Sequence, residues 1–86
     1  MKTFKDLEFK DHPLHDGIIA RIKFENGYGA SVVRHEYSYG GRTGLFELAV
    51  LDSNDELCYS TTVTNDVIGY LRDIDVSDVM EKIQQL

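Results

Sequence analysis

Residues 18–36 read IIARIKFENGYGASVVRHE, and this stretch decides the fold. Apolar and charged side chains alternate over residues 18–25, which is typical of a strand with one buried face. An Asn-Gly dipeptide follows at 26–27, and it suits the two positive φ angles of a type I′ hairpin turn. Residues 28–36 form the returning strand, in which Gly29 indicates a bulge or a close approach of two main chains. The stretch therefore predicts an antiparallel β-hairpin.

Two segments that follow the hairpin extend it into a sheet. Residues 45–51 are apolar on both faces, which favours a central strand. Residues 57–63 are predicted to be a further strand, because they are rich in β-branched and aromatic side chains. Before the hairpin, Phe4, Leu7 and Phe9 either join a short edge strand or lie across the core.

The hydrophobic period changes from two to helical in the last third of the chain. Thr64, Asn65 or Asp66 can cap a short helix over residues 67–71, which Gly69 keeps brief. Ser77 or Asp75 can cap a second helix. Its apolar stripe consists of Val76, Val79, Met80, Ile83 and Leu86.

These elements predict an α+β fold. We expect an antiparallel β-meander of about four strands, followed by one or two C-terminal helices that pack on one face of the sheet. The 86 residues are the length of a single domain, 1–86. With 42% apolar and 28% charged residues, the composition is that of an ordinary globular protein and excludes wholesale disorder.

Cysteine usage and hydropathy point to the cytoplasm. Cys58 is the one cysteine, so the chain has no internal disulfide and is not a disulfide-stapled secreted module. The N-terminus has no apolar stretch like that of a signal peptide, and no run is long enough to span a membrane. We therefore expect a cytosolic protein without membrane contact.

The formal charge of −6 is unevenly distributed along the chain. Residues 1–43 carry a net charge of +1, whereas residues 44–86 carry −7. A negative protein gains little from a phosphate backbone, which disfavours direct nucleic-acid binding. Such asymmetry indicates either a positively charged partner or a solvated surface that keeps the protein in solution.

The loop over residues 37–44, YSYGGRTG, is the first candidate binding site. Tyr37, Tyr39 and Arg42 are residue types enriched at binding hot spots. Glycines allow close approach to a partner, and tyrosines with an arginine could also stack on nucleobases. The alternative is a flexible hairpin loop without a binding role.

The acidic residues of the second half are the second candidate. Placed together on one side, they would suit a basic groove of the kind that handles nucleic acid. Turn and helix-cap chemistry accounts for where they lie but not for the shortage of nearby lysine and arginine. The set consists of Asp52, Asp55, Glu56, Asp66, Asp73, Asp75 and Asp78.

Two other clusters contain side chains that could carry chemistry. His12, His15 and Asp16 could hold a divalent metal, but Pro13 makes this segment an extended turn and the usual four-ligand pattern is missing. His35 and Cys58 could form a nucleophilic pair, but a cysteine in a strand is usually a small buried apolar residue. We therefore predict no catalytic residue, metal or cofactor.

The chain also resembles small uncharacterised proteins encoded by bacteriophages and prophages, through residues 24–33, 46–51 and 66–71. The resemblance implies a phage accessory protein that acts in the host bacterial cytoplasm. Size, charge and implied origin together suggest an inhibitor of host defence, such as an anti-CRISPR protein. Its expected partner is a host protein or nucleoprotein complex with a basic surface.

Two alternative functions stay open at this point. One is a phage structural or assembly module that self-associates, as a homodimer for example, through a sheet edge or its helix. The other is a binder of a small ligand, such as a nucleotide signal, that uses the glycine-rich loop.

Overall fold

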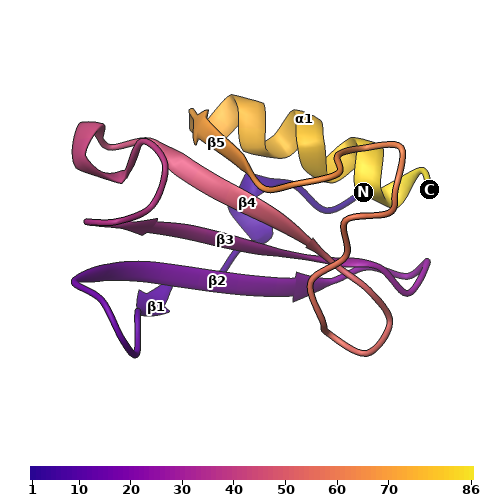
Figure 1. The fold of residues 1–86 in the computed structure, drawn as a ribbon. Coiled ribbons are helices and arrows are strands. Elements are labelled where there is room, and N and C mark those ends of the chain that lie inside the picture. Colours follow the sequence, from indigo (N-terminus) through magenta and orange to yellow (C-terminus); the bar gives the residue numbers. More distant parts are fainter.

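The computed structural model describes residues 1–86 and confirms the α+β class. A single antiparallel sheet has the strand order β1-β2-β3-β4-β5, so each strand pairs with the next along the chain. The strands are β1 (Lys10–Asp11), β2 (Gly17–Lys23), β3 (Gly29–His35), β4 (Phe46–Leu51) and β5 (Ile68–Leu71). One helix, α1 (Asp73–Gln84), packs on one face of the sheet (Figure 1). Two 3₁₀ turns, η1 (Phe4–Asp6) and η2 (Gly41–Thr43), lie before β1 and between β3 and β4.

The predicted hairpin is confirmed as β2 and β3, which pair along their whole length. Its turn, however, is not type I′. The Gly27 N–H donates to the Phe24 carbonyl at 3.1 Å, and the Phe24 N–H donates to the Tyr28 carbonyl at 2.8 Å. Gly27 alone has a positive φ there, of 93°. The loop therefore has three residues, a type I turn followed by a left-handed glycine.

The segment after β4 corrects two predictions. Residues 57–63 are not a strand, because a single bridge joins Leu57 to Leu51 and the chain then leaves the sheet. Residues 68–71, predicted to be helical, are strand β5, in which Leu71 lies opposite Phe46. Strand β4 has β3 on one side, and β5 pairs with the 46–48 part of its other edge. Leu57 and Cys58 reach the rest of that edge, at Leu51 and Val50, before the chain leaves the sheet.

Helix α1 is the one C-terminal helix, and it begins earlier than predicted. Arg72 is its N-cap, in place of Ser77 or Asp75, and the Arg72 N–H donates to Asp75 Oδ2 at 3.0 Å. Leu86 lies beyond the helix and is exposed. The rest of the predicted stripe is confirmed as the buried face, formed by Val76, Val79, Met80 and Ile83.

The N-terminal residues lie across the core on the helix side of the sheet. Phe4 packs edge-on against Phe46 with ring centroids 5.2 Å apart, and its N–H donates to Ser77 Oγ at 2.9 Å. Leu7 is buried in the same core, and Phe9 packs against it. The chain therefore meets the sheet edge only at the two-residue strand β1.

The meander places its connections at two ends of the sheet, as Figure 1 shows. Residues 24–28 and 52–57 lie at one end, which we call the hairpin end. Residues 12–16, 36–45 and 70–73 lie at the other, which we call the tyrosine end. The candidate functional residues divide between these two ends.

Candidate functional site

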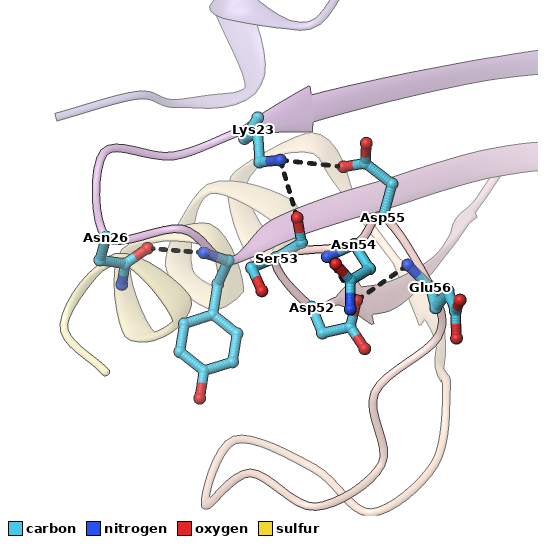
Figure 2. Close-up of polar contacts among 8 residues, drawn as sticks. Lys23, Asn26, Asp52, Ser53, Asn54, Asp55 and Glu56 are labelled. Carbon is cyan, nitrogen blue, oxygen red and sulfur yellow. Dashed lines mark hydrogen bonds and ion pairs between the residues drawn. The ribbon is translucent and has the colours of Figure 1, made fainter.

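Three of the predicted acidic residues lie in the turn after β4, at the hairpin end (Figure 2). Asp52 Oδ1 accepts the N–H groups of Asn54 at 2.8 Å and Glu56 at 3.0 Å. Asp55 pairs with Lys23 at 3.6 Å, and Lys23 Nζ also donates to the Ser53 carbonyl. Asp52 and Asp55 therefore stabilise the turn itself.

The other four predicted acidic residues lie in the β4–β5 connection and on α1. Asp66 accepts the Val67 N–H at 2.7 Å, and Asp73 accepts the Ile74 N–H at 2.8 Å. Asp78 is exposed on the helix. The structure therefore spreads the seven carboxylates over both ends of the sheet and the helix and does not gather them on one side.

Asp75 is the acidic residue with the best-defined partner. Arg72 Nε donates to its Oδ2 at 2.9 Å, and Arg72 Nη2 donates to its Oδ1 at 3.1 Å. The side-chain and main-chain hydrogen bonds from Arg72 lower the pKa of Asp75, and the same contact raises the pKa of Arg72. This pair belongs to the start of the helix, so it is a structural contact.

Tyr37 and Tyr39 lie at the tyrosine end, where Tyr39 meets a third tyrosine, Tyr70, from β5. We call Tyr37, Tyr39 and Tyr70 the tyrosine patch; their exposed fractions are 67%, 58% and 66%. The Tyr70 N–H donates to the Tyr39 carbonyl at 3.1 Å. Gly69 permits this contact, because a Cβ there would overlap the Cβ of Tyr39. Two segments about thirty residues apart in sequence are thus joined at this patch.

Tyr70 has an unusual main-chain conformation. Its φ is 57°, in the left-handed region that few residues other than glycine adopt. Holding a tyrosine there costs about 1–2 kcal/mol, which the surrounding contacts must offset. Such strained residues cluster at functional sites. Here the strained residue presents an exposed aromatic ring next to Tyr39.

The loop that carries Tyr37, Tyr39 and Arg42 is held by hydrogen bonds. Ser38 is buried; its Oγ accepts the His35 N–H at 3.0 Å and donates to the His35 carbonyl at 2.9 Å. Arg42 Nε donates to the Glu36 carbonyl at 3.1 Å, which ties the two ends of the loop together. The Tyr39 N–H donates to Glu47 Oε1 at 3.1 Å. The loop therefore has a defined shape that fixes where its tyrosines lie.

All three histidines of the chain also meet at the tyrosine end. The ring centroid of His35 lies 4.8 Å from that of His12 and 4.5 Å from that of His15, and the rings of His15 and His35 are stacked. Tyr37 packs edge-on against His15 at 5.3 Å. This histidine cluster (His12, His15, His35) thus joins the β1–β2 connection to the tyrosine patch.

Two of these histidines act as hydrogen-bond acceptors. His12 Nδ1 accepts the N–H groups of Leu14 at 3.1 Å and His15 at 3.2 Å, and His35 Nδ1 accepts the Tyr37 N–H at 3.1 Å. A ring nitrogen that carries a proton cannot accept, so these bonds require neutral imidazoles. Partial burial, then His15 and His12, lower the pKa of His35 below its usual value, although Glu47 and Glu36 oppose the shift.

We predict that acidification destabilises the protein. Because the pKa of His35 is lower in the folded chain than the value of about 6.5 expected when unfolded, the folded state binds fewer protons below neutrality. The stabilisation present above about pH 6.5 is therefore lost as the pH falls through the pKa of folded His35. Urea unfolding measured between pH 7.5 and pH 5 should show a decreasing free energy of unfolding.

A variant isolates the contribution of His35 to this pH dependence. His35→Asn keeps an acceptor oxygen near the position of Nδ1 but does not titrate in this range. The free energy of unfolding of the variant should depend less on pH than that of the parent protein. If the free energy of unfolding depended equally on pH in the two proteins, His35 would not be the cause of the pH dependence.

The remaining chemical candidates are not assembled. Although three histidine rings are in contact, no group of three or more histidine, cysteine, aspartate or glutamate side chains is arranged to hold a metal ion. Cys58 lies at the hairpin end, where its Sγ contacts Ser60 Oγ at 3.6 Å. His35 is at the opposite end of β3, so the two residues do not form a pair.

The sequence interpretation identified two tyrosines of the patch and missed Tyr70 and the histidine cluster. The sequence predicts a helix at Tyr70, and it places His12 and His15 in one candidate site and His35 in another. Gly69-Tyr70 packs against Tyr39-Gly40, but the two dipeptides lie about thirty residues apart and neither one predicts the contact. Their meeting depends on β5 pairing with β4, which local sequence does not decide.

Comparison with protein-family models, curated proteins and solved structures finds no match for this chain. The single helix, α1, is too short and too polar to cross a membrane.

Proposed function

We propose that this chain is a non-catalytic binding protein that docks a partner protein on the tyrosine patch. The observation that carries the proposal is a main-chain hydrogen bond that joins strained Tyr70 of β5 to Tyr39 of the loop that also carries Tyr37, with all three side chains more than half exposed. Tyrosine is enriched at interface hot spots because it combines a large apolar ring with a hydroxyl group. A fixed aromatic patch of this kind suits a protein surface.

The charge of the protein favours a basic partner. Two of its fifteen carboxylates form ion pairs, those of Asp55 and Asp75. At the tyrosine end, Glu36 and Asp73 are exposed, and neither forms an ion pair. A partner that offers lysine or arginine around an aromatic-binding pocket would complement this end. This partner would be the host protein or nucleoprotein complex with a basic surface that the sequence predicts. The phage origin of the chain stays a prediction.

We predict that replacing Tyr37 and Tyr39 together with alanine weakens partner binding at least ~30-fold, the effect of losing about 2 kcal/mol at a hot spot. Partner proteins are captured from bacterial lysate through a photocrosslinking residue placed at Ile74, which is exposed at the start of α1 next to the tyrosine end. The affinity for the purified partner is then measured. Tyr59→Ala is the matched control, because Tyr59 is 44% exposed but lies outside the patch.

The same experiment separates the alternatives. Capture should lose strength as salt rises, because exposed charges are screened. A partner that binds the Tyr37→Ala/Tyr39→Ala variant as tightly as the parent protein would exclude the patch, and binding unaffected by salt would exclude the electrostatic contribution. Crosslinks solely to a second copy of the chain would indicate the self-associating module instead.

A further inference from the structure

The outer edge of β2 is only partly covered. Strand β1 pairs with Ile18 and Ile19, and the chain before Lys10 then turns under the sheet because Phe9 and Leu7 pack into the core. Residues 20–23 therefore have β3 on one side and no strand on the other. Surface hollows of about 430 Å³ and 490 Å³ flank this part of β2, so there is room beside it.

The pairing of β2 with β3 shows which main-chain groups point outward. Phe24 donates its N–H to Tyr28, and a Cβ on Gly29 would lie 2.6 Å from the Ile22 carbonyl oxygen. Phe24 and Ile22 therefore direct their main-chain groups toward β3. In an antiparallel strand the direction alternates, so Arg21 and Lys23 direct their N–H and C=O groups away from β3.

The side chains along this edge alternate in chemistry as well. Arg21 and Lys23 are exposed on the face opposite α1, and Lys10 lies on the same face. Ile22 lies between them on the core side and is half-buried. Arg21 has no ion pair, and the Lys23–Asp55 pair is long and exposed, so Lys23 can exchange its partner at little cost. Glu8 is the one carboxylate in the hollow beside Arg21.

We propose that this edge binds an extended acidic peptide segment of a partner as an additional strand beside β2. In the antiparallel register, the residues opposite Arg21 and Lys23 lie on the same face as these cations, and the residue between them lies beside Ile22. The segment that fits thus has carboxylates at two alternate positions with an apolar residue between them. Main-chain hydrogen bonds to Arg21 and Lys23 supply the remaining contacts.

A second copy of this chain fits the edge less well. If β2 of one copy paired with β2 of another around Ile22, Arg21 would face Lys23 of the copy. Like charges placed directly opposite each other destabilise a strand pair. The proposal concerns a surface different from the tyrosine patch and does not depend on it.

The test uses the full chain and a seven-residue peptide that alternates glutamate and valine, beginning and ending with glutamate. Hydrogen exchange of the Arg21 and Lys23 amides, followed by NMR, should slow at least tenfold at saturating peptide. A lysine–valine peptide of the same length should have no such effect. Arg21→Glu should weaken binding of the glutamate peptide at least tenfold. Lys82→Glu, which reverses a cation on α1, should leave binding unchanged.

Each other outcome overturns the proposal. Unchanged exchange at millimolar peptide, or equal binding of the lysine peptide, would exclude the acidic strand. Protection of the two amides that grows with protein concentration alone would assign the edge to a second copy.

Lys10→Glu serves as a second charge reversal if Arg21→Glu does not fold. The Tyr37→Ala/Tyr39→Ala variant should bind the peptide normally, so failure here is distinguishable from failure of the proposed function.

Discussion

Replacing Gly41 with alanine is expected to lower the free energy of unfolding by about 3 kcal/mol, the upper part of the usual range for overpacking. A Cβ at Gly41 would overlap the His35 carbonyl oxygen and Ser38 Oγ. The His35 carbonyl oxygen belongs to the main chain, so no rotamer change can move it aside. Ser38 is buried, and its Oγ both accepts and donates a hydrogen bond. Urea unfolding measures the stability, and partner binding should be lost together with the loop geometry.

Gly44 provides the matched control in the same loop. Its φ is 80°, but a Cβ there would meet no atom within 4 Å. Gly44→Ala therefore carries only the conformational cost of a left-handed alanine, about 1 kcal/mol. Equal losses in the two variants would show that the loop relaxes around Gly41, which would contradict the fixed loop shape on which the tyrosine patch depends.

Local sequence was sufficient for the three central strands, β2, β3 and β4. The alternating pattern over residues 18–25 and the Asn-Gly turn bring two neighbouring segments together, so β2 and β3 follow from nearby residues. The turn type did not follow, because Asn and Gly in sequence fit several hairpin loops. The pairing of Phe24 with Tyr28 selected the three-residue loop.

The sequence predicts residues 57–71 wrongly, because competition for the free edge of β4 decides their structure. Residues 57–63 and residues 68–71 both have strand-forming side chains, but the free edge of β4 is shared: residues 68–71 pair with its 46–48 part, which leaves only Val50 and Leu51 for Cys58 and Leu57. Thr64 and Asp66 were expected to begin a helix. Instead, Thr64 Oγ1 and the Asp66 main chain bond each other in a turn. The residues that were predicted to cap a helix therefore form a turn.

The candidate site could be predicted only in part for the same reason. Tyr37, Tyr39 and Arg42 were visible because one loop holds them all. Tyr70 and the histidine cluster arise from contacts between segments far apart in sequence, so no local pattern contains them. The acidic residues were visible individually, but their dispersal over both ends of the sheet depends on the direction of each strand.

Replacing Leu48 with alanine is expected to have the largest effect on stability, about 3–4 kcal/mol. Leu48 is fully buried in the middle of β4, where it lies opposite Val32 on β3 and Ile68 on β5. Truncation removes buried apolar area and leaves a cavity among these three strands and α1. Because a domain of this size is stable by only about 5–15 kcal/mol, the loss is a large share of the total.

Leu57→Ala is the matched control, since Leu57 is exposed after β4 and its truncation should change the free energy of unfolding by no more than about 0.5 kcal/mol.

Hydrogen exchange then distinguishes Leu48→Ala from Gly41→Ala. Leu48 contacts both β3 and β5, so its truncation should speed exchange throughout the sheet, whereas Gly41→Ala should act mainly on residues 36–45. If Leu48→Ala sped up hydrogen exchange in β5 alone, β5 and Tyr70 would unfold separately from the core. The strained Tyr70 conformation would then lack the support that its cost requires.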